Sequence, residues 1–356
     1  MFGRGTPTAT PSFGDAYDRR RNNFDVLRFG LAASVIWSHC YALAGRPMDP
    51  VFALTHQIDA GSLAVQAFFV LSGFLITQSW IGDPDLRDYT VKRALRLVPA
   101  LLAALVFGAL VVGPLMTTGP VLGYLTASST WAHFDGVALH RHLASPFLFG
   151  DNPVPHQLNA SLWSLRYEML CYGLVALIGL WSGARWTVVT PLVLATALVA
   201  QVVLGRFGAP PAGVATTLDE LVGCFFAGAA AALVAAGLVG GLRVVFPLAG
   251  TYLLLFAGCW RGLPLQGFGR YGDFSYGLYV FAYPIQQAIV QHAGTGISIP
   301  VFFVLAFVAT LVLAILSWHF IEAPSLARKP RRAPVRVTAP SCPTGAAWPV
   351  TSPGGS

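Results

Sequence analysis

Long runs of apolar residues, separated by short polar connections, recur along the chain from Phe24 to the region of Ile321. Each run is close to the roughly 20 residues that an α-helix needs to cross a bilayer. Strong windows lie at about 24–44, 62–81, 95–115, 162–182, 187–204, 216–238, 244–260, 271–292 and 299–320, and a weaker one lies near 119–139. Because these runs are continuously apolar rather than alternating, they predict membrane helices and not the strands of a barrel.

The composition agrees with this pattern. Of the 356 residues, 55% are hydrophobic and only 10% are charged, and the mean hydropathy is +0.63, which excludes an ordinary soluble domain. The sequence therefore predicts an all-α, polytopic transmembrane helical bundle of about 10 spans. We expect residues 1–22 to form a disordered cytoplasmic lead, 23–327 a membrane domain, and 328–356 a disordered basic, proline-rich tail.

Basic residues cluster before the first window, after the second and after the last. The clusters are Arg19, Arg20 and Arg21; Arg87, Lys92, Arg93 and Arg96; and Arg328, Lys329, Arg331, Arg332 and Arg336. Because cytoplasmic loops of membrane proteins are rich in Lys and Arg, we expect all three clusters and both termini in the cytoplasm, with the first helix as an uncleaved anchor. That arrangement requires an even number of spans, so the weak window near 119–139 is taken as the tenth. The net charge of +7 follows the same rule and is no argument for a nucleic-acid partner.

Two ionisable residues, Arg28 and His39, lie in the first window. Eleven helical residues make almost a whole number of turns, so both side chains project from one face, roughly 16 Å apart along the axis. Ionisable groups inside a membrane helix indicate a functional site by default. A structural interpretation is equally open, with Arg28 as a cytoplasmic anchor and His39 as a polar residue between helices.

Arg93 and Arg96 lie three residues apart near the start of the window at 95–115, so they share one helical face. The positive end of a helix dipole disfavours cations but favours an anionic ligand. Arginine also binds phosphate through two parallel hydrogen bonds, which lysine cannot do. We therefore predict a phosphate-bearing ligand on the cytoplasmic side. Interfacial snorkelling of the two side chains is the alternative.

Glu168 lies in the window at 162–182 and shares a helical face with Ser164. It either lines a cavity or pairs with Arg166 or an arginine of another helix. The five cysteines include no C-x-x-C pair, and His140 and His142 have no third ligand nearby. The sequence therefore predicts neither a metal site nor a disulfide framework.

Six short motifs, spread in order over residues 24–327, resemble those of the membrane-bound acyltransferase family 3, which O-acylates bacterial surface polysaccharides and related acceptors. They are R-x10-H (Arg28, His39), S-G-F (Ser72, Gly73, Phe74), R-x-x-R (Arg93, Arg96), W-S-L-x-x-E (Trp163, Ser164, Leu165, Glu168), S-Y-x-x-Y-x-x-x-x-P (Ser275, Tyr276, Tyr279, Pro284) and I-E-x-P (Ile321, Glu322, Pro324). Each motif is weak alone, but the set is specific. The chain departs from the family at Ala282-Tyr283-Pro284, where many members carry a histidine just before a W/F-P pair, so a catalytic role of that histidine cannot be transferred.

The resemblance implies an enzyme of the inner membrane that moves an acyl group, most commonly acetyl, from cytoplasmic acyl-CoA to a hydroxyl of a carbohydrate or glycoconjugate. It implies no metal. Arg28, Arg93 and Arg96 would then bind the CoA, and His39 and Glu168 would be the catalytic residues. His39 is assigned first as a general base and second as a transient acyl carrier.

Two other classes of protein fit part of the pattern. A transporter or flippase would also place Arg, His and Glu inside the membrane, although the sequence shows no internal repeat. A catalytically silent membrane protein that binds acyl-CoA or lipid would keep the arginines without needing His39. Acyl-CoA-dependent loss of acceptor hydroxyls, compared between the native protein and His39→Ala, separates an enzyme from both.

Overall fold

The computed structural model of the chain describes residues 22–138, 145–182, 250–259 and 265–329. Every named element in these ranges is helical, apart from one isolated β-bridge between Thr117 and Leu148. The all-α class predicted from the sequence is therefore confirmed for this part of the chain. The windows at 187–204 and 216–238, and most of the two terminal segments, lie outside the described residues.

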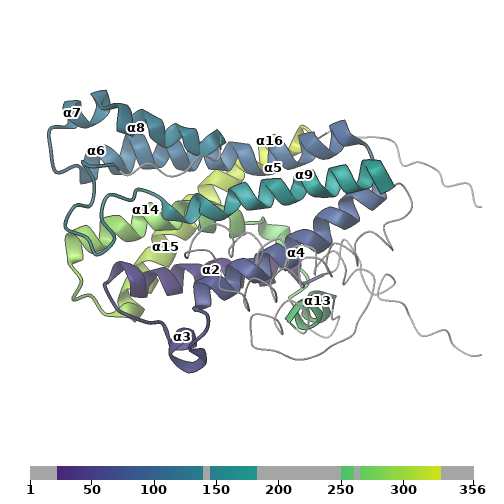
Figure 1. Cartoon of the computed structure of the whole chain (residues 1–356), viewed down its shortest axis with the longest axis horizontal. Helices are drawn as coiled ribbons and strands as arrows, with labels where there is room; N and C mark the ends of the chain where they lie inside the picture. Colours follow the sequence, from purple (N-terminus) through teal and green to yellow (C-terminus); the bar gives the residue numbers. More distant parts are fainter. Residues whose placement is uncertain (1–21, 139–144, 183–249, 260–264, 330–356) are drawn as a thin grey trace, which may run out of the picture.

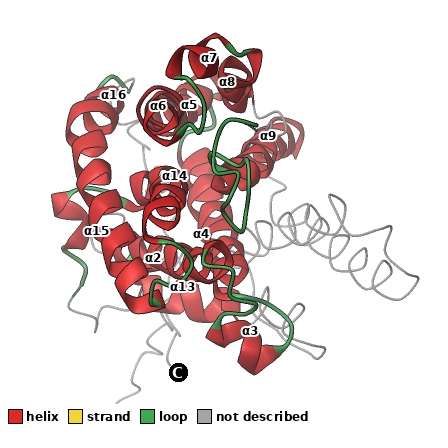
Figure 2. Cartoon of the chain, turned by 90° about the vertical axis from the view of Figure 1, so that its left-hand side faces the viewer, coloured by secondary structure: helices red, strands yellow, loops and turns green. Residues whose placement is uncertain are grey.

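In the described part of the chain, six long helices form the bundle (Figures 1 and 2). They are α2 (Phe24–Leu43), α4 (Ala60–Gly82), α5 (Leu86–Phe107), α9 (Leu165–Ser182), α14 (Ser275–Ala293) and α15 (Ile299–Ser317). The described residues contain four stretches long and apolar enough to cross a membrane: Phe24–Leu43, Ala60–Trp80, Leu86–Met116 and Ile299–Ala327. A multi-pass helical membrane protein is thus supported, whereas the predicted number of about ten spans is not confirmed.

Two of the long helices continue through a π-helical turn. α5 passes through η1 (Gly108–Val112) into α6 (Gly113–Met116), and α15 passes through η6 (Trp318–Glu322) into α16 (Ala323–Ala327). In the first turn the Gly113 amide bonds to the Gly108 carbonyl, so the carbonyl of Ala109 faces Pro114, which has no N–H. The Tyr124 hydroxyl donates to that carbonyl instead, at 2.9 Å.

The weak window near 119–139 is not one continuous helix, which corrects the prediction of a regular tenth span there. It forms α7 (Val121–Thr126), α8 (Ser128–Ala132) and the 3-10 turn η2 (His133–Ala138). Ala127 has extended backbone angles between the first two, and the Thr130 hydroxyl donates to the Tyr124 carbonyl at 2.6 Å. Ser and Thr side chains in this run compete with the backbone for hydrogen bonds, and this interrupts the helix.

α14 lies at the centre of the bundle and packs against α2, α5 and α15 (Figure 2). It crosses α15 closely at Gly277, where an added Cβ would lie 2.8 Å from the Cα of Ala314. Pro284 inside the helix leaves the carbonyl of Val280 without its usual N–H donor. The side-chain amide of Asn159 donates to this buried carbonyl at 2.8 Å. This hydrogen bond attaches the segment that precedes α9 to α14.

Different helices and turns lie at the two ends of the bundle. Short helix α3 (Pro50–Thr55) and α7 lie toward one end, at the left of Figure 1, whereas the first turns of α5 and the last turn of α9 lie toward the other. Both η6 and α16 pack against α5. The basic residues at the start of α5 therefore lie close to Lys329, which follows α16.

Candidate active site

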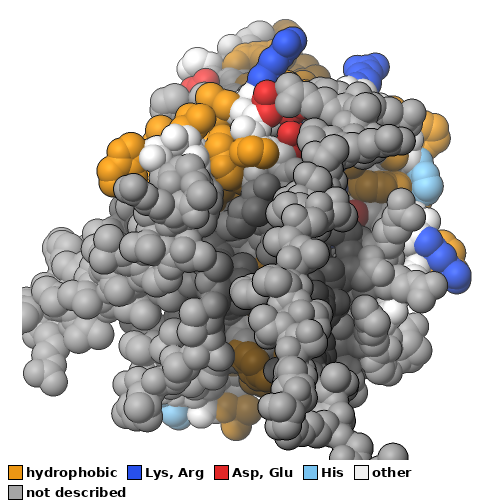
Figure 3. All heavy atoms as spheres, turned by 90° about the vertical axis from the view of Figure 1, so that its right-hand side faces the viewer, with side chains coloured by type: hydrophobic (Ala, Val, Ile, Leu, Met, Phe, Trp, Pro, Cys, Tyr) orange, Lys and Arg blue, Asp and Glu red, His pale blue; other side chains and the backbone are white. Residues whose placement is uncertain are grey.

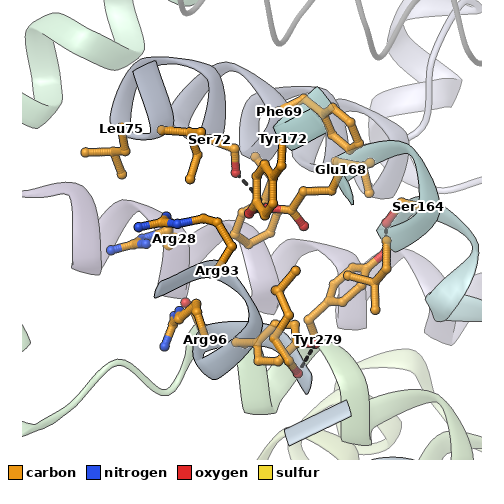
Figure 4. Close-up of a pocket in the computed structure, with 17 residues that line it drawn as sticks. Arg28, Phe69, Ser72, Leu75, Arg93, Arg96, Ser164, Glu168, Tyr172 and Tyr279 are labelled. Atoms are coloured by element: carbon orange, nitrogen blue, oxygen red, sulfur yellow. Dashed lines mark hydrogen bonds between the residues drawn. The ribbon is translucent and has the colours of Figure 1, made fainter. Parts of the chain in front are cut away.

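A pocket lies among α2, α4, α5, α9 and α14 (Figure 4). Its polar lining consists of Arg28, Ser72, Arg93, Arg96, Ser164, Glu168, Tyr172, Ser275, Tyr276 and Tyr279. The list includes four of the five site residues predicted from the sequence, three arginines and Glu168. In Figure 4 the arginines gather on one side, and Ser164 and Tyr279 lie on the other.

Asp273 organises the basic side of the pocket. One of its carboxylate oxygens lies 2.6 Å from Nη2 of Arg96 and 3.4 Å from Nη2 of Arg28. Arg28 also pairs with Asp25 at 2.5 Å. Sequence reasoning missed Asp273, although a lone carboxylate directly before an apolar helix was a usable signal. Because two arginines converge on this carboxylate, much of their charge is compensated within the protein.

Arg93 differs from its two neighbours. Among the described residues it forms no ion pair, and its Nε is buried without a hydrogen-bond partner. Its guanidinium carbon lies 6.0 Å from the centre of the Tyr89 ring, near the limit of a cation–π contact. A partly buried guanidinium that lines a pocket and has no carboxylate partner among the described residues is suited to an anionic ligand.

Glu168 faces the pocket opposite the arginines. It accepts hydrogen bonds from the Ser72 hydroxyl at 3.0 Å and from the Tyr172 hydroxyl. Arg166 instead donates to the Tyr167 hydroxyl at 2.8 Å and lies over that ring. Of the two interpretations left by the sequence, the structure therefore shows Glu168 lining the cavity rather than pairing with Arg166.

A chain of hydroxyl groups closes the far side of the pocket. Tyr279 donates to the Ser161 carbonyl at 2.7 Å, so in the contact between the hydroxyls of Ser164 and Tyr279, also 2.7 Å, Ser164 is the donor. Tyr276 donates to the Leu97 carbonyl at 3.0 Å and thereby joins α14 to α5. These bonds fix the rings that separate the pocket from the rest of the bundle.

His39 does not line the pocket, and lies farther along α2 from Arg28. It is half-buried, its Nδ1 has no hydrogen-bond partner, and its ring meets Tyr283 edge to face with centroids 5.3 Å apart. Tyr276, Tyr279 and Tyr283 recur at helical spacing on one face of α14. This row of tyrosines leads from the pocket wall to His39.

Two carboxylates lie close to His39 at its end of α2. The Ser38 hydroxyl contacts Asp49 at 2.7 Å and Asp59 at 3.1 Å, and Asp59 caps α4 through the Ser62 amide at 2.8 Å. Burial alone would raise the pKa of Asp59, but the hydrogen bonds from Ser62 and Ser38 lower it below its ordinary value. Asp59 therefore stays ionised and its charge acts on His39.

No group of three or more potential metal ligands occurs among the described residues, and His140 and His142 lie outside them.

The family model described as an acyltransferase domain matches residues 21–263. An O-acetyl transferase of Shigella phage Sf6 is 29% identical over 347 residues, covering 87% of this chain and 97% of the relative. Nodulation protein 10 of Rhizobium leguminosarum bv. viciae is 28% identical over 356 residues, covering 86% of this chain and 93% of the relative. No solved structure matches. The match over more than half of the sequence shows that the chain is an acyltransferase and belongs to acyltransferase family 3.

Proposed function

We propose that the protein is an integral-membrane O-acyltransferase that moves an acetyl group from cytoplasmic acetyl-CoA to a hydroxyl of a glycan or glycosylated acceptor. The observation that carries this proposal is the polarity of the pocket. Three arginines lie on one side, hydroxyl groups lie on the other, and a row of tyrosines continues to His39.

The arginine side of the pocket suits the nucleotide end of acyl-CoA. That end carries phosphates, and Arg93 offers a guanidinium without a carboxylate partner among the described residues. Arg28 and Arg96, which share Asp273, shape the rim and add positive potential. This arrangement also supports a cytoplasmic position for the start of α5, in line with its basic residues.

The reaction needs a base near the acceptor. An imidazole nitrogen of His39 would take the proton of the acceptor hydroxyl as its oxygen forms a bond to the thioester carbonyl carbon. The C–S bond then breaks, the acyl group stays on the acceptor oxygen, and the proton passes to the departing thiolate to give free CoA. Asp59, held ionised nearby, would stabilise the imidazolium that forms.

Glu168 contributes on the pocket side. It accepts from Ser72 and Tyr172, and so holds both hydroxyl groups toward the space between the arginines and Ser164. In this position it would orient the pantetheine amides of the donor through hydrogen bonds. The name of the phage relative, O-acetyl transferase, supports acetyl as the group transferred.

Transfer in isolated membranes tests the proposal. Membranes with the native protein should move label from acetyl-CoA to the cell-surface glycan fraction, and membranes with His39→Ala at equal abundance should not. Mass spectrometry of glycans from a deletion strain should then show the loss of an acetyl group that alkali removes. Unchanged glycans and no labelled product with the native protein would reject the assignment.

A further inference from the structure

Lys329 follows the last described helix and turns back toward the start of α5. Its amide donates to the Leu326 carbonyl at 3.2 Å, which continues the turn that ends α16. α16 itself packs against α5, and the Lys329 side chain is half-buried there. Burial lowers the pKa of Lys329, and the positive charges of Arg93, Arg96 and Lys92 lower it further.

Lys329 lies near three other cations, Lys92, Arg93 and Arg96, and only two of the four pair with a carboxylate of a described residue. Lys92 pairs with Asp83 at 2.6 Å, and Arg96 pairs with Asp273 at 2.6 Å. Arg93 and Lys329 form no ion pair with any described residue. Figure 3 looks onto this end of the bundle and shows Lys and Arg side chains at its upper rim, with acidic side chains beside them. Two partly buried, uncompensated cations repel each other unless an anion lies between them.

We propose that Arg93 and Lys329 together bind a phosphate monoester, and that this group is the 3′-phosphate of the CoA donor. The inference rests on the proposed function and adds to it a ligand-binding residue that comes from the segment after the final helix. A phosphate monoester carries a charge of about −1.5 to −2 at neutral pH, enough to compensate both cations. Arg93 also lines the pocket, so the nucleotide end would be anchored at the rim while the thioester end reaches inward.

Binding of CoA and 3′-dephospho-CoA to the full-length protein in phosphatidylcholine nanodiscs tests this inference by calorimetry. The native protein should bind CoA at least about tenfold more tightly than 3′-dephospho-CoA, because hydrogen bonds to charged groups contribute factors of this order. Lys329→Ala should weaken CoA binding to the level of 3′-dephospho-CoA and leave binding of the latter unchanged. Arg328→Ala is the matched control, since it removes the same charge from the exposed neighbouring position and should keep the preference.

Three results would overturn the inference. The first is that Lys329→Ala weakens the binding of CoA and of 3′-dephospho-CoA equally, and the second is that it weakens neither. The third is that the native protein binds the two nucleotides with equal affinity. Lys329→Ala could also change nucleotide binding only in nanodiscs that contain phosphatidylglycerol, and by the same factor for both nucleotides. That result would assign the cation pair to a lipid headgroup. Absence of binding of either nucleotide to the native protein would reject the acyl-CoA donor, and with it both proposals.

Discussion

Arg93 and Arg96 are three residues apart on one helix, yet their surroundings give them different roles. Arg96 is held by Asp273, whereas Arg93 has no carboxylate partner among the described residues. Arg93→Ala should therefore leave a folded protein that binds acyl-CoA roughly tenfold or more weakly, through loss of charge-assisted hydrogen bonds. Arg93→Lys should recover only part of the affinity, because lysine lacks the planar fork. Calorimetry with detergent-purified variants measures both, and native affinity in Arg93→Ala would make the residue an interface anchor.

Arg96→Ala should act mainly on stability. Among the described residues, it leaves Asp273 with Arg28 as its only cationic partner, at the longer distance, and it removes the one cation that pairs with Glu322, which is 1% exposed. Breaking a buried ion pair in this way costs about 3–5 kcal/mol, so we expect poor membrane abundance and a lower unfolding temperature. Arg96→Met combined with Asp273→Asn should be more stable than Arg96→Met alone. Equal stability of the two variants would show that Asp273 does not depend on Arg96.

Much of the site could be predicted from individual residues, because charged residues are rare in an apolar chain and each one inside a membrane helix indicates a functional site. Arg28, Arg93, Arg96 and Glu168 meet in one pocket as their sequence positions suggested. Asp273 was missed and Lys329 was noted only as one member of a basic cluster, because the role of a charge beside a helix end depends on its neighbours on other helices. The same limit applies to the alternatives for Glu168, which only the positions of Ser72 and Tyr172 resolve.

At the scale of elements, the proline in α14 and the amide of Asn159 form one unit. Asn159→Ala should destabilise the protein by about 1–3 kcal/mol, because the Val280 carbonyl is left buried without a donor. Pro284→Ala restores an N–H that can bond to this carbonyl, so Asn159→Ala should cost less in that background. Denaturant unfolding of the native protein, the two single variants and the double variant in detergent measures the coupling. Strictly additive costs would show that the amide and the proline act independently.

Helix positions follow the apolar windows where those windows are long. The windows at 24–44, 162–182 and 299–320 match α2, α9 and α15 to within a few residues at most ends. Hydropathy alone did not reveal the break at Ala127 or the two π turns, since each depends on a local competition for backbone hydrogen bonds. The break at Ala127 accompanies the hydrogen bond from Thr130 to the Tyr124 carbonyl, and the Tyr124 hydroxyl supplies the donor at the first π turn.

In the whole molecule, entry of the donor from the cytoplasm requires that the arginine side of the pocket faces the cytoplasm and that α3 faces the opposite side. In a variant with all five native cysteines replaced, a cysteine at Leu54, which is 84% exposed, should react with an impermeant maleimide in intact cells. A cysteine at Arg328 should react only after the membrane is opened. Labelling of the Arg328 position in intact cells would contradict the topology and the direction of donor entry.

If the pocket holds the donor while His39 performs the transfer, the two functions should separate in His39→Gln, on which acetyl-CoA binding and acceptor acetylation are both measured. Glutamine keeps much of the size and some of the hydrogen bonding of histidine but cannot accept the proton. We expect native binding of acetyl-CoA, native membrane abundance and transfer reduced by roughly 10²–10⁴-fold. Transfer by His39→Gln at a near-native rate would contradict the claim and leave His39 as a structural residue.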